Sequence, residues 1–150
     1  MTHVAITARV YVDNSGAFAE VPALLTADGL LAPLLDYCLH RHHDRSLSWM
    51  RKLIQSVSLL LDYIEANPGE VEPWRLFRNF AQRLYTGTYD LESGLDPSNL
   101  CWAPRGWKNA AYIIRLLSEF FDWLDKTNPS VIGINPKYTG NAHDRRLDET

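Results

Sequence analysis

A long run of regularly spaced apolar residues constrains the fold of this chain most strongly. Between residues 47 and 64 these residues recur at spacings of three and four, the period of an amphipathic helix. They are Leu47, Met50, Leu53, Ile54, Val57, Leu60, Leu61 and Ile64. Ser46 is an N-cap candidate before them, and Asn67-Pro68-Gly69 is a strong stop signal after them. The pattern predicts one helix whose opposite face carries Ser48, Arg51, Lys52, Gln55 and Asp62.

Three further segments share the helical period. They begin at residue 29 or 30, at Pro73 and at residue 105 or 106, and end near His40, Thr86 and Asp125. Their apolar stripes are Leu30, Leu31, Leu34, Leu35 and Cys38; then Trp74, Phe77, Phe80, Ala81 and Leu84; then Trp107, Ala110, Ala111, Ile114, Leu117, Phe121 and Leu124. Four helices with one apolar stripe each can share a core. Glycines and prolines between residues 86 and 104 predict a loop.

The first part of the chain has the period of a strand instead. Val4, Ile6, Ala8, Val10 and Val12 alternate with other residues, which predicts a strand with one buried face. A turn cluster at 13–16 and a second short strand at 17–21 complete a β-hairpin. The predicted fold class is therefore mainly α, with an N-terminal hairpin (1–25), a helical domain (26–129) and a linker (130–150).

Composition sets the broad class of protein. The chain has 150 residues and a net charge of −3, which argues against coating nucleic acid through bulk charge. It has no apolar run long enough for a membrane span and no signal-peptide pattern at its start, so a cytoplasmic protein is expected. Neither Cys38 nor Cys101 belongs to a CxxC pair, and Cys38 is expected to be a buried thiol.

Catalytic and metal-binding patterns are weak in this sequence. Cys38, His40, His42 and His43 lie within six residues, but no second Cys/His pair lies near them in sequence. Solvated histidines at a helix end explain the cluster more simply than a metal site does. There is no nucleophile-elbow motif and no phosphate-binding glycine loop. We expect no cofactor and no catalytic activity from these residues.

Positive charge is concentrated at the start of the second predicted helix. In RHHDRSLSWMRK, residues 41–52, four Arg and Lys residues oppose one acidic residue, which gives a net charge of +3. Helix N-termini favour anions, and Arg and Lys beside small hydroxyls suit phosphate contacts. The DNA-binding residues predicted here are Arg45, Ser46, Ser48, Arg51 and Lys52. An ordinary solvated helix end is the alternative.

The start of the last predicted helix repeats this chemistry. The segment APRGWKN contains Arg105, Trp107, Lys108 and Asn109. Arg and Lys can pair with phosphate or guanine, and Asn can hydrogen-bond adenine. These residues join the predicted DNA-binding set. Trp49 and Trp107 are interpreted either as core residues or as residues that flank the basic patch.

The helical part resembles the core-binding region of tyrosine recombinases, the phage-type integrases. RSLSWMRKLIQSVSLLLDYIEAN is similar to the second helix of that region, and APRGWKNAAYIIRLLSEFFDWLDKTN to its fourth. The resemblance covers about residues 26–136 and is greatest to integrases of mobile elements, among them the gamma-mobile-trio type. It implies a SAM-like helical clamp on duplex DNA, which acts as a homo-oligomer in the full-length recombinase.

The departures from that family define what this chain is expected to lack. The family's nucleophilic tyrosine and its Arg/Lys/His set belong to a C-terminal domain, and the chain ends where that domain would begin. The match His42-x-x-Arg45 lies in the wrong domain and is interpreted as chance. Two other functions stay open: a protein-interaction module that binds an acidic partner, and a small metal-dependent enzyme built on the histidine cluster.

Overall fold

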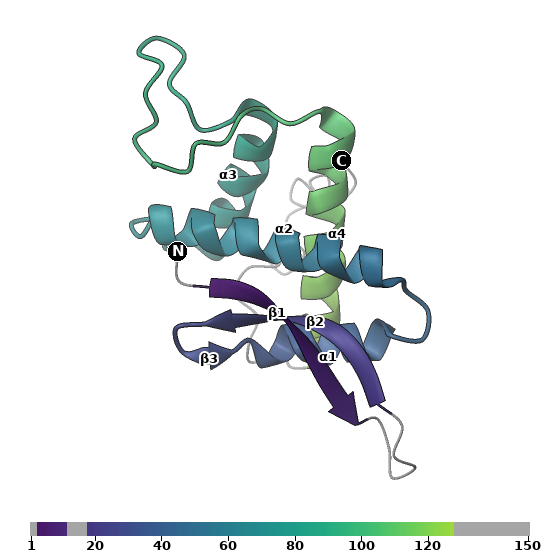
Figure 1. The fold of residues 1–150 in the computed structure, drawn as a ribbon. Helices are drawn as coiled ribbons and strands as arrows, with labels where there is room; N and C mark the ends of the chain where they lie inside the picture. Colours follow the sequence, from purple (N-terminus) through teal and green to yellow (C-terminus); the bar gives the residue numbers. More distant parts are fainter. Residues whose placement is uncertain (1–2, 12–17, 128–150) are drawn as a thin grey trace. The chain divides into compact units, whose positions relative to one another are not determined.

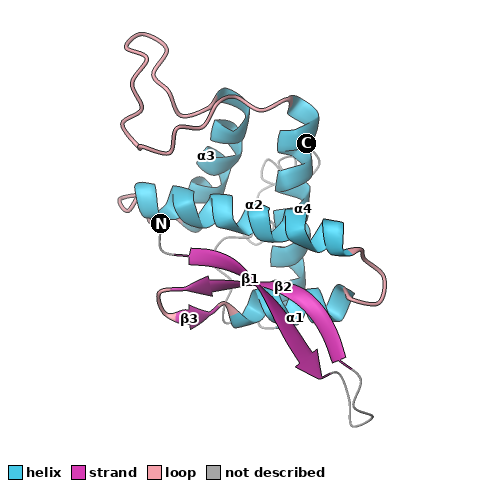
Figure 2. Cartoon of the chain, in the orientation of Figure 1, coloured by secondary structure: helices cyan, strands magenta, loops and turns pink. Residues whose placement is uncertain are grey.

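The computed structural model describes residues 3–11 and 18–127, which form three strands and four helices (Figures 1 and 2). The strands are β1 (His3–Tyr11), β2 (Phe18–Thr26) and β3 (Gly29–Leu30). The helices are α1 (Ala32–Arg41), α2 (Leu47–Ala66), α3 (Pro73–Thr86) and α4 (Trp107–Thr127). The four predicted helices and the predicted antiparallel pairing of the first two strands are confirmed. The predicted turn at 13–16 and the linker at 130–150 lie outside the described residues.

The chain divides into two compact units, Met1–Ser58 and Leu59–Thr150. The boundary falls inside α2, so the first half of this helix belongs to the first unit and the second half to the second unit. The strands and α1 lie in the first unit together with residues 47–58. The second unit contains α3, the loop that follows it, and α4.

The sheet of the first unit has the strand order β1-β2-β3. β1 and β2 pair antiparallel from His3↔Thr26 to Tyr11↔Phe18. β2 is longer than the predicted strand at 17–21. The prediction stopped at residue 21 because the apolar run 21–25 does not alternate, and its period does not distinguish a strand from a helix. β3 was not predicted: Gly29, with a φ of 110°, allows a tight turn, and α1 begins only at Ala32.

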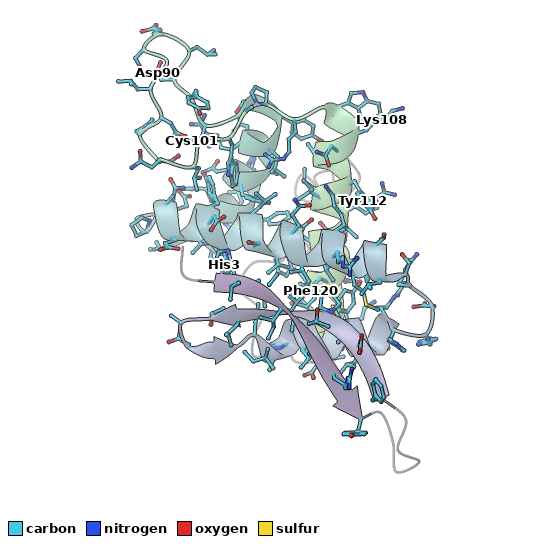
Figure 3. The ribbon with its side chains drawn as sticks, in the orientation of Figure 1. His3, Asp90, Cys101, Lys108, Tyr112 and Phe120 are labelled. Carbon is cyan, nitrogen blue, oxygen red and sulfur yellow. The ribbon has the colours of Figure 1, made fainter. Side chains whose placement is uncertain are left out.

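The burial of β1 differs from the prediction. Val4 and Ile6 were expected on the buried face, but they are 54% and 37% exposed. The opposite face carries His3, which is buried and whose Nε2 lies 2.7 Å from Ser58 Oγ on α2 (Figure 3). Because side chains alternate along a strand, Ala5 and Thr7 share this face with His3. Ala5, Thr7 and Arg9 are nevertheless exposed, whereas Ala8 and Val10 of the predicted face are half-buried and pair with the buried Val21 and Ala19. The strand period was therefore correct, and neither face of β1 is buried along its whole length.

The core of the first unit lies between the sheet and its two helices. Its buried residues are Ala19, Val21, Ala23 and Leu24 of β2, Leu34, Tyr37 and Cys38 of α1, and Met50, Leu53, Ile54 and Val57 of α2. Cys38 is fully buried as predicted, and burial raises the pKa of its thiol to about 12. Both cysteines are free. Cys38 is therefore an apolar packing residue.

The second helix has the predicted ends. Ser46 Oγ accepts a hydrogen bond of 3.1 Å from the backbone N–H of Trp49, which is the N-cap interaction. At the other end the Asn67 side chain donates to the Tyr63 carbonyl, and the helix stops at Ala66. The predicted stripe is buried except at its margins, where Leu47 is exposed.

Aromatic rings form the core of the second unit. Phe80 lies at the centre of the cluster, with ring centroids 5.8 Å from Tyr63, 6.0 Å from Phe77 and 5.9 Å from Trp102. Phe77 in turn contacts Phe121 of α4 at 5.6 Å. These rings join α3, α4 and the intervening loop in one packed unit.

The loop between α3 and α4 returns onto the end of α3. Gly87, with a φ of 77° and a ψ of 179°, makes the turn. Thr88 N–H donates to the Trp102 carbonyl, and Trp102 N–H donates to Thr88 Oγ1. The Asp96 carboxylate accepts from Thr88, Ser98 and the backbone N–H of Cys101. These hydrogen bonds fix the path of the loop, which contains no helix or strand.

Candidate nucleic-acid interface

The basic segment before α2 loses part of its charge to a local ion pair. Arg41 Nε lies 3.3 Å from Asp44 Oδ1. Arg45 instead stacks on Trp49, with its guanidinium carbon 5.3 Å from the ring centroid. Arg45 is exposed, so its charge faces solvent. The other cations of the segment are Arg45, Arg51 and Lys52.

Trp49 combines the two roles considered for it. Its ring is half-buried and lies 6.0 Å from the ring of Tyr37 in α1. The guanidinium groups of Arg41 and Arg45 approach the same ring system. Trp49 thus anchors the start of α2 on α1 and holds the neighbouring arginines by cation–π interactions.

Four polar side chains of α2 line one groove in the first unit. Ser48, Arg51, Lys52 and Gln55 form one wall of this groove, whose volume is about 650 Å³. The other lining residues include Ala5, Ile6 and Thr7 of β1 and Pro22 of β2, the cross-strand partner of Thr7. β1 starts near α2 at His3 and runs away from it toward Tyr11, so the two elements diverge along the groove (Figure 1). We call this feature the β1–α2 groove.

The β1–α2 groove has a positive rim. Arg51 and Lys52 line it, Ser48 and Gln55 add hydrogen-bonding groups, and none of its lining residues is acidic. Ser46 does not line the groove, and its hydroxyl accepts the capping hydrogen bond from the Trp49 N–H. The structure therefore brings together Ser48, Arg51 and Lys52 of the predicted set. Gln55 and the β1 residues were missed, the latter because they lie more than 40 residues away in sequence.

The start of α4 presents three of its four predicted residues to solvent. Trp107, Lys108 and Asn109 are exposed, and Lys108 Nζ lies 5.8 Å from the Trp107 ring (Figure 3). Trp107 is 68% exposed, so its place in the predicted apolar stripe is wrong. It is the first residue of the helix and lies beyond the packed turns that begin at Ala110. Of the two interpretations of Trp107, the core one is therefore excluded.

Arg105 is built into the second unit. Its guanidinium carbon lies 5.4 Å from the Trp102 ring, and its backbone N–H donates to the Leu84 carbonyl. Burial lowers the pKa of its guanidinium, and Nη1 is buried with no hydrogen-bond partner among the described residues. Arg105 therefore packs the loop against the aromatic cluster, whereas its neighbours face solvent.

The second unit contains a smaller pocket of about 200 Å³, lined by Tyr63, Ala66, Asn67, Arg83, Thr88, Pro97 and Ser98. No group of three or more His, Cys, Asp or Glu side chains among the described residues is arranged to hold a metal ion. None of the helices in 3–11 and 18–127 is long and apolar enough to cross a membrane. The β1–α2 groove and the exposed start of α4 carry the basic residues that the sequence predicted.

Comparison with known proteins adds no relative. No protein-family model, curated protein or solved structure matches the chain.

Proposed function

We propose that the chain binds duplex DNA through the basic face of α2, in the manner of the recombinase core-binding region that it resembles. The observation that carries the proposal is the alignment of Ser48, Arg51 and Lys52 along one wall of a groove with no acidic lining residue. Arg45 extends the same charge to the start of the helix. Cations of this kind fix a protein on DNA by contacting phosphates.

The start of α4 is the second contact in this proposal. Lys108 and Asn109 are exposed in the first turn of that helix, where a cation and an amide can contact phosphate and base edges. Arg105 is not assigned a contact, because it packs on Trp102. The SAM-like clamp, the recombinase family and the oligomer on DNA rest on the sequence resemblance. In this proposal the described residues bind DNA and do not cleave its strands.

A salt titration tests the proposal. The chain is titrated against a labelled mixed-sequence duplex, with fluorescence anisotropy as the readout, at about 50 and about 200 mM salt. Four phosphate contacts from Arg45, Arg51, Lys52 and Lys108 correspond to a slope of about −3.6 in log K against log salt, or about a 150-fold loss of affinity over this range. Absence of binding at the lower salt concentration, or binding that does not change with salt, would contradict the proposal.

A further inference from the structure

The loop between α3 and α4 contains a turn with three exposed apolar side chains. They belong to Tyr89, Leu91 and Leu95, which are 41%, 98% and 71% exposed. Two hydrogen bonds close the turn: the Asp90 N–H donates to the Leu95 carbonyl at 2.7 Å, and the Gly94 N–H donates to the Asp90 carbonyl at 2.9 Å. We call residues 89–95 the Leu91 turn. Single exposed leucines are ordinary, but apolar side chains grouped on one closed turn are typical of a contact surface.

The charge around the Leu91 turn is entirely negative. Residues 84–104 contain three acidic side chains and no Lys, Arg or His. Asp96 is engaged by hydrogen bonds within the loop. Asp90 and Glu92 are exposed on either side of Leu91 in the sequence (Figure 3). A partner for this turn therefore needs an apolar surface with positive charge beside it.

The β1–α2 groove has this complementary composition. Its volume of about 650 Å³ lies in the range of pockets that hold ligands of many atoms. Arg51 lines the groove and is exposed, and none of the lining residues is acidic. Lys52 also lines it but already has an interaction within the chain, so Arg51 is the cation assigned to an incoming carboxylate. The apolar lining residues are Ala5, Ile6, Pro22 and Ile54.

We propose that the Leu91 turn of one copy of the chain docks in the β1–α2 groove of a second copy. Leu91 contacts the apolar lining of the groove, and the Glu92 carboxylate pairs with Arg51. Because every copy carries both complementary surfaces, a second copy meets the requirements of charge and apolar contact. The two surfaces differ, so the contact is head-to-tail. The proposal does not rest on DNA binding, but a docked turn and duplex DNA compete for Arg51.

Self-association of the full chain tests the docking. Sedimentation equilibrium from about 10 μM to about 1 mM covers the dissociation constants of weak contacts, and the average mass should rise with concentration. Leu91→Ser should weaken association about ten-fold or more, because one leucine is no longer buried. Val71→Ser is the matched control, since Val71 is 83% exposed outside the turn. A monomer at every concentration, or equal weakening by both variants, would overturn the proposal.

Charge reversal tests the pairing of the two surfaces. Arg51→Glu and Glu92→Arg should each weaken self-association about ten-fold or more, because like charges then meet. An equimolar mixture of the two variants should associate again, since the first keeps the normal turn and the second keeps the normal groove. Arg75→Glu and Glu119→Arg make the same charge changes at exposed positions of α3 and α4 and should have no effect. Unweakened single variants, a mixture that stays monomeric, or equal weakening by the controls would overturn the pairing.

Duplex titrations separate this proposal from the proposed function. Leu91→Ser should bind duplex at least as tightly as the unchanged chain, because the competing turn no longer occupies the groove. If the charge-reversed mixture associates but the chain does not bind duplex, DNA binding fails and the docking stands. If the chain binds duplex but is a monomer at every concentration without DNA, the docking fails and DNA binding stands.

Discussion

The start of α2 and the start of α4 have similar sequences but use their basic residues differently. Arg45 and Arg105 both stack on a tryptophan, at 5.3 Å from Trp49 and 5.4 Å from Trp102. Trp49 is half-buried and leaves Arg45 in solvent, whereas Trp102 belongs to the aromatic core and draws Arg105 inward. An arginine near a helix start is therefore a ligand candidate only where the surface on which it packs is itself exposed.

The two regions also differ in what holds them in place. The start of α2 is a regular helix, held by its own backbone hydrogen bonds and by the Ser46 cap. The segment before α4 is an irregular loop whose path depends on Gly87, Asp96 and Trp102. Substitutions on the exposed face of α2 should therefore change DNA binding without changing stability. Substitutions in the loop before α4 should change both.

The largest loss of stability is expected from Gly87→Ala. The φ of 77° and ψ of 179° lie in a region that only glycine occupies readily, and a Cβ would lie 2.6 Å from the Trp102 carbonyl oxygen. We expect a loss of about 1–3 kcal/mol in the free energy of unfolding, measured by urea denaturation. Gly69→Ala is the control, because a Cβ added there would have no atom within 4 Å. Equal effects of the two substitutions would contradict the role of Gly87 in closing the loop.

Substitutions of Ser46 and Ser48 should have different effects: the first should lower stability, and the second should weaken duplex binding. Ser46→Ala removes the acceptor for Trp49 N–H and should cost about 1 kcal/mol in thermal or urea unfolding. Ser48→Ala changes an exposed residue on the groove wall and should leave stability within about 0.5 kcal/mol. It should weaken duplex binding more than Ser46→Ala does. A larger stability loss at Ser48 than at Ser46 would reverse this assignment.

Arg105 and Lys108 both belong to the predicted DNA-binding set, but Arg105 packs on Trp102 whereas Lys108 is exposed. Arg105→Ala removes the stacking on Trp102 and should destabilise the chain by about 1 kcal/mol. Lys108→Ala should change stability by less than about 0.5 kcal/mol and should reduce the salt slope of duplex binding by about 1. Unfolding curves and a salt series on each variant check both effects. A stable Arg105→Ala variant with a reduced salt slope would restore Arg105 to the interface.

Acid should weaken the loop before α4 through Asp96. Desolvation raises the pKa of this carboxyl, but hydrogen bonds from Ser98, Thr88 and the Cys101 backbone outweigh it and hold the pKa well below its ordinary value. A depressed pKa stabilises the folded state above the unfolded value of about 4, and this contribution is lost as the pH falls below it. Asp96→Asn should flatten the dependence of the melting temperature on pH in that range. Glu92→Gln, in the same loop, should leave it unchanged.

Local patterns account for most of what the sequence predicted correctly. The period of three and four residues, the Ser46 cap and Pro73 at the start of α3 define the helices without knowledge of tertiary structure. Two features have a non-local origin. The burial of His3 in β1 depends on its contact with Ser58 of α2, and the exposure of Trp107 depends on where the packed part of α4 begins.

The candidate site divides in the same way. Ser48, Arg51 and Lys52 lie on one helical face and could be grouped from their spacing in the sequence. The lining residues Ala5–Thr7 and the docking of Arg105 N–H on the Leu84 carbonyl could not, because each depends on contacts between residues far apart in the chain.

The most direct test of the central claim is duplex binding by two charge-matched double variants. Arg51→Ala with Lys52→Ala removes the cations of the groove, and Arg75→Ala with Arg115→Ala removes two exposed cations from α3 and α4. Anisotropy titrations over a salt series should show that the first pair lowers the salt slope by about 1.8 and the second pair leaves it unchanged. Equal reductions in both variants would mean that bulk charge, and not the basic face of α2, binds the DNA.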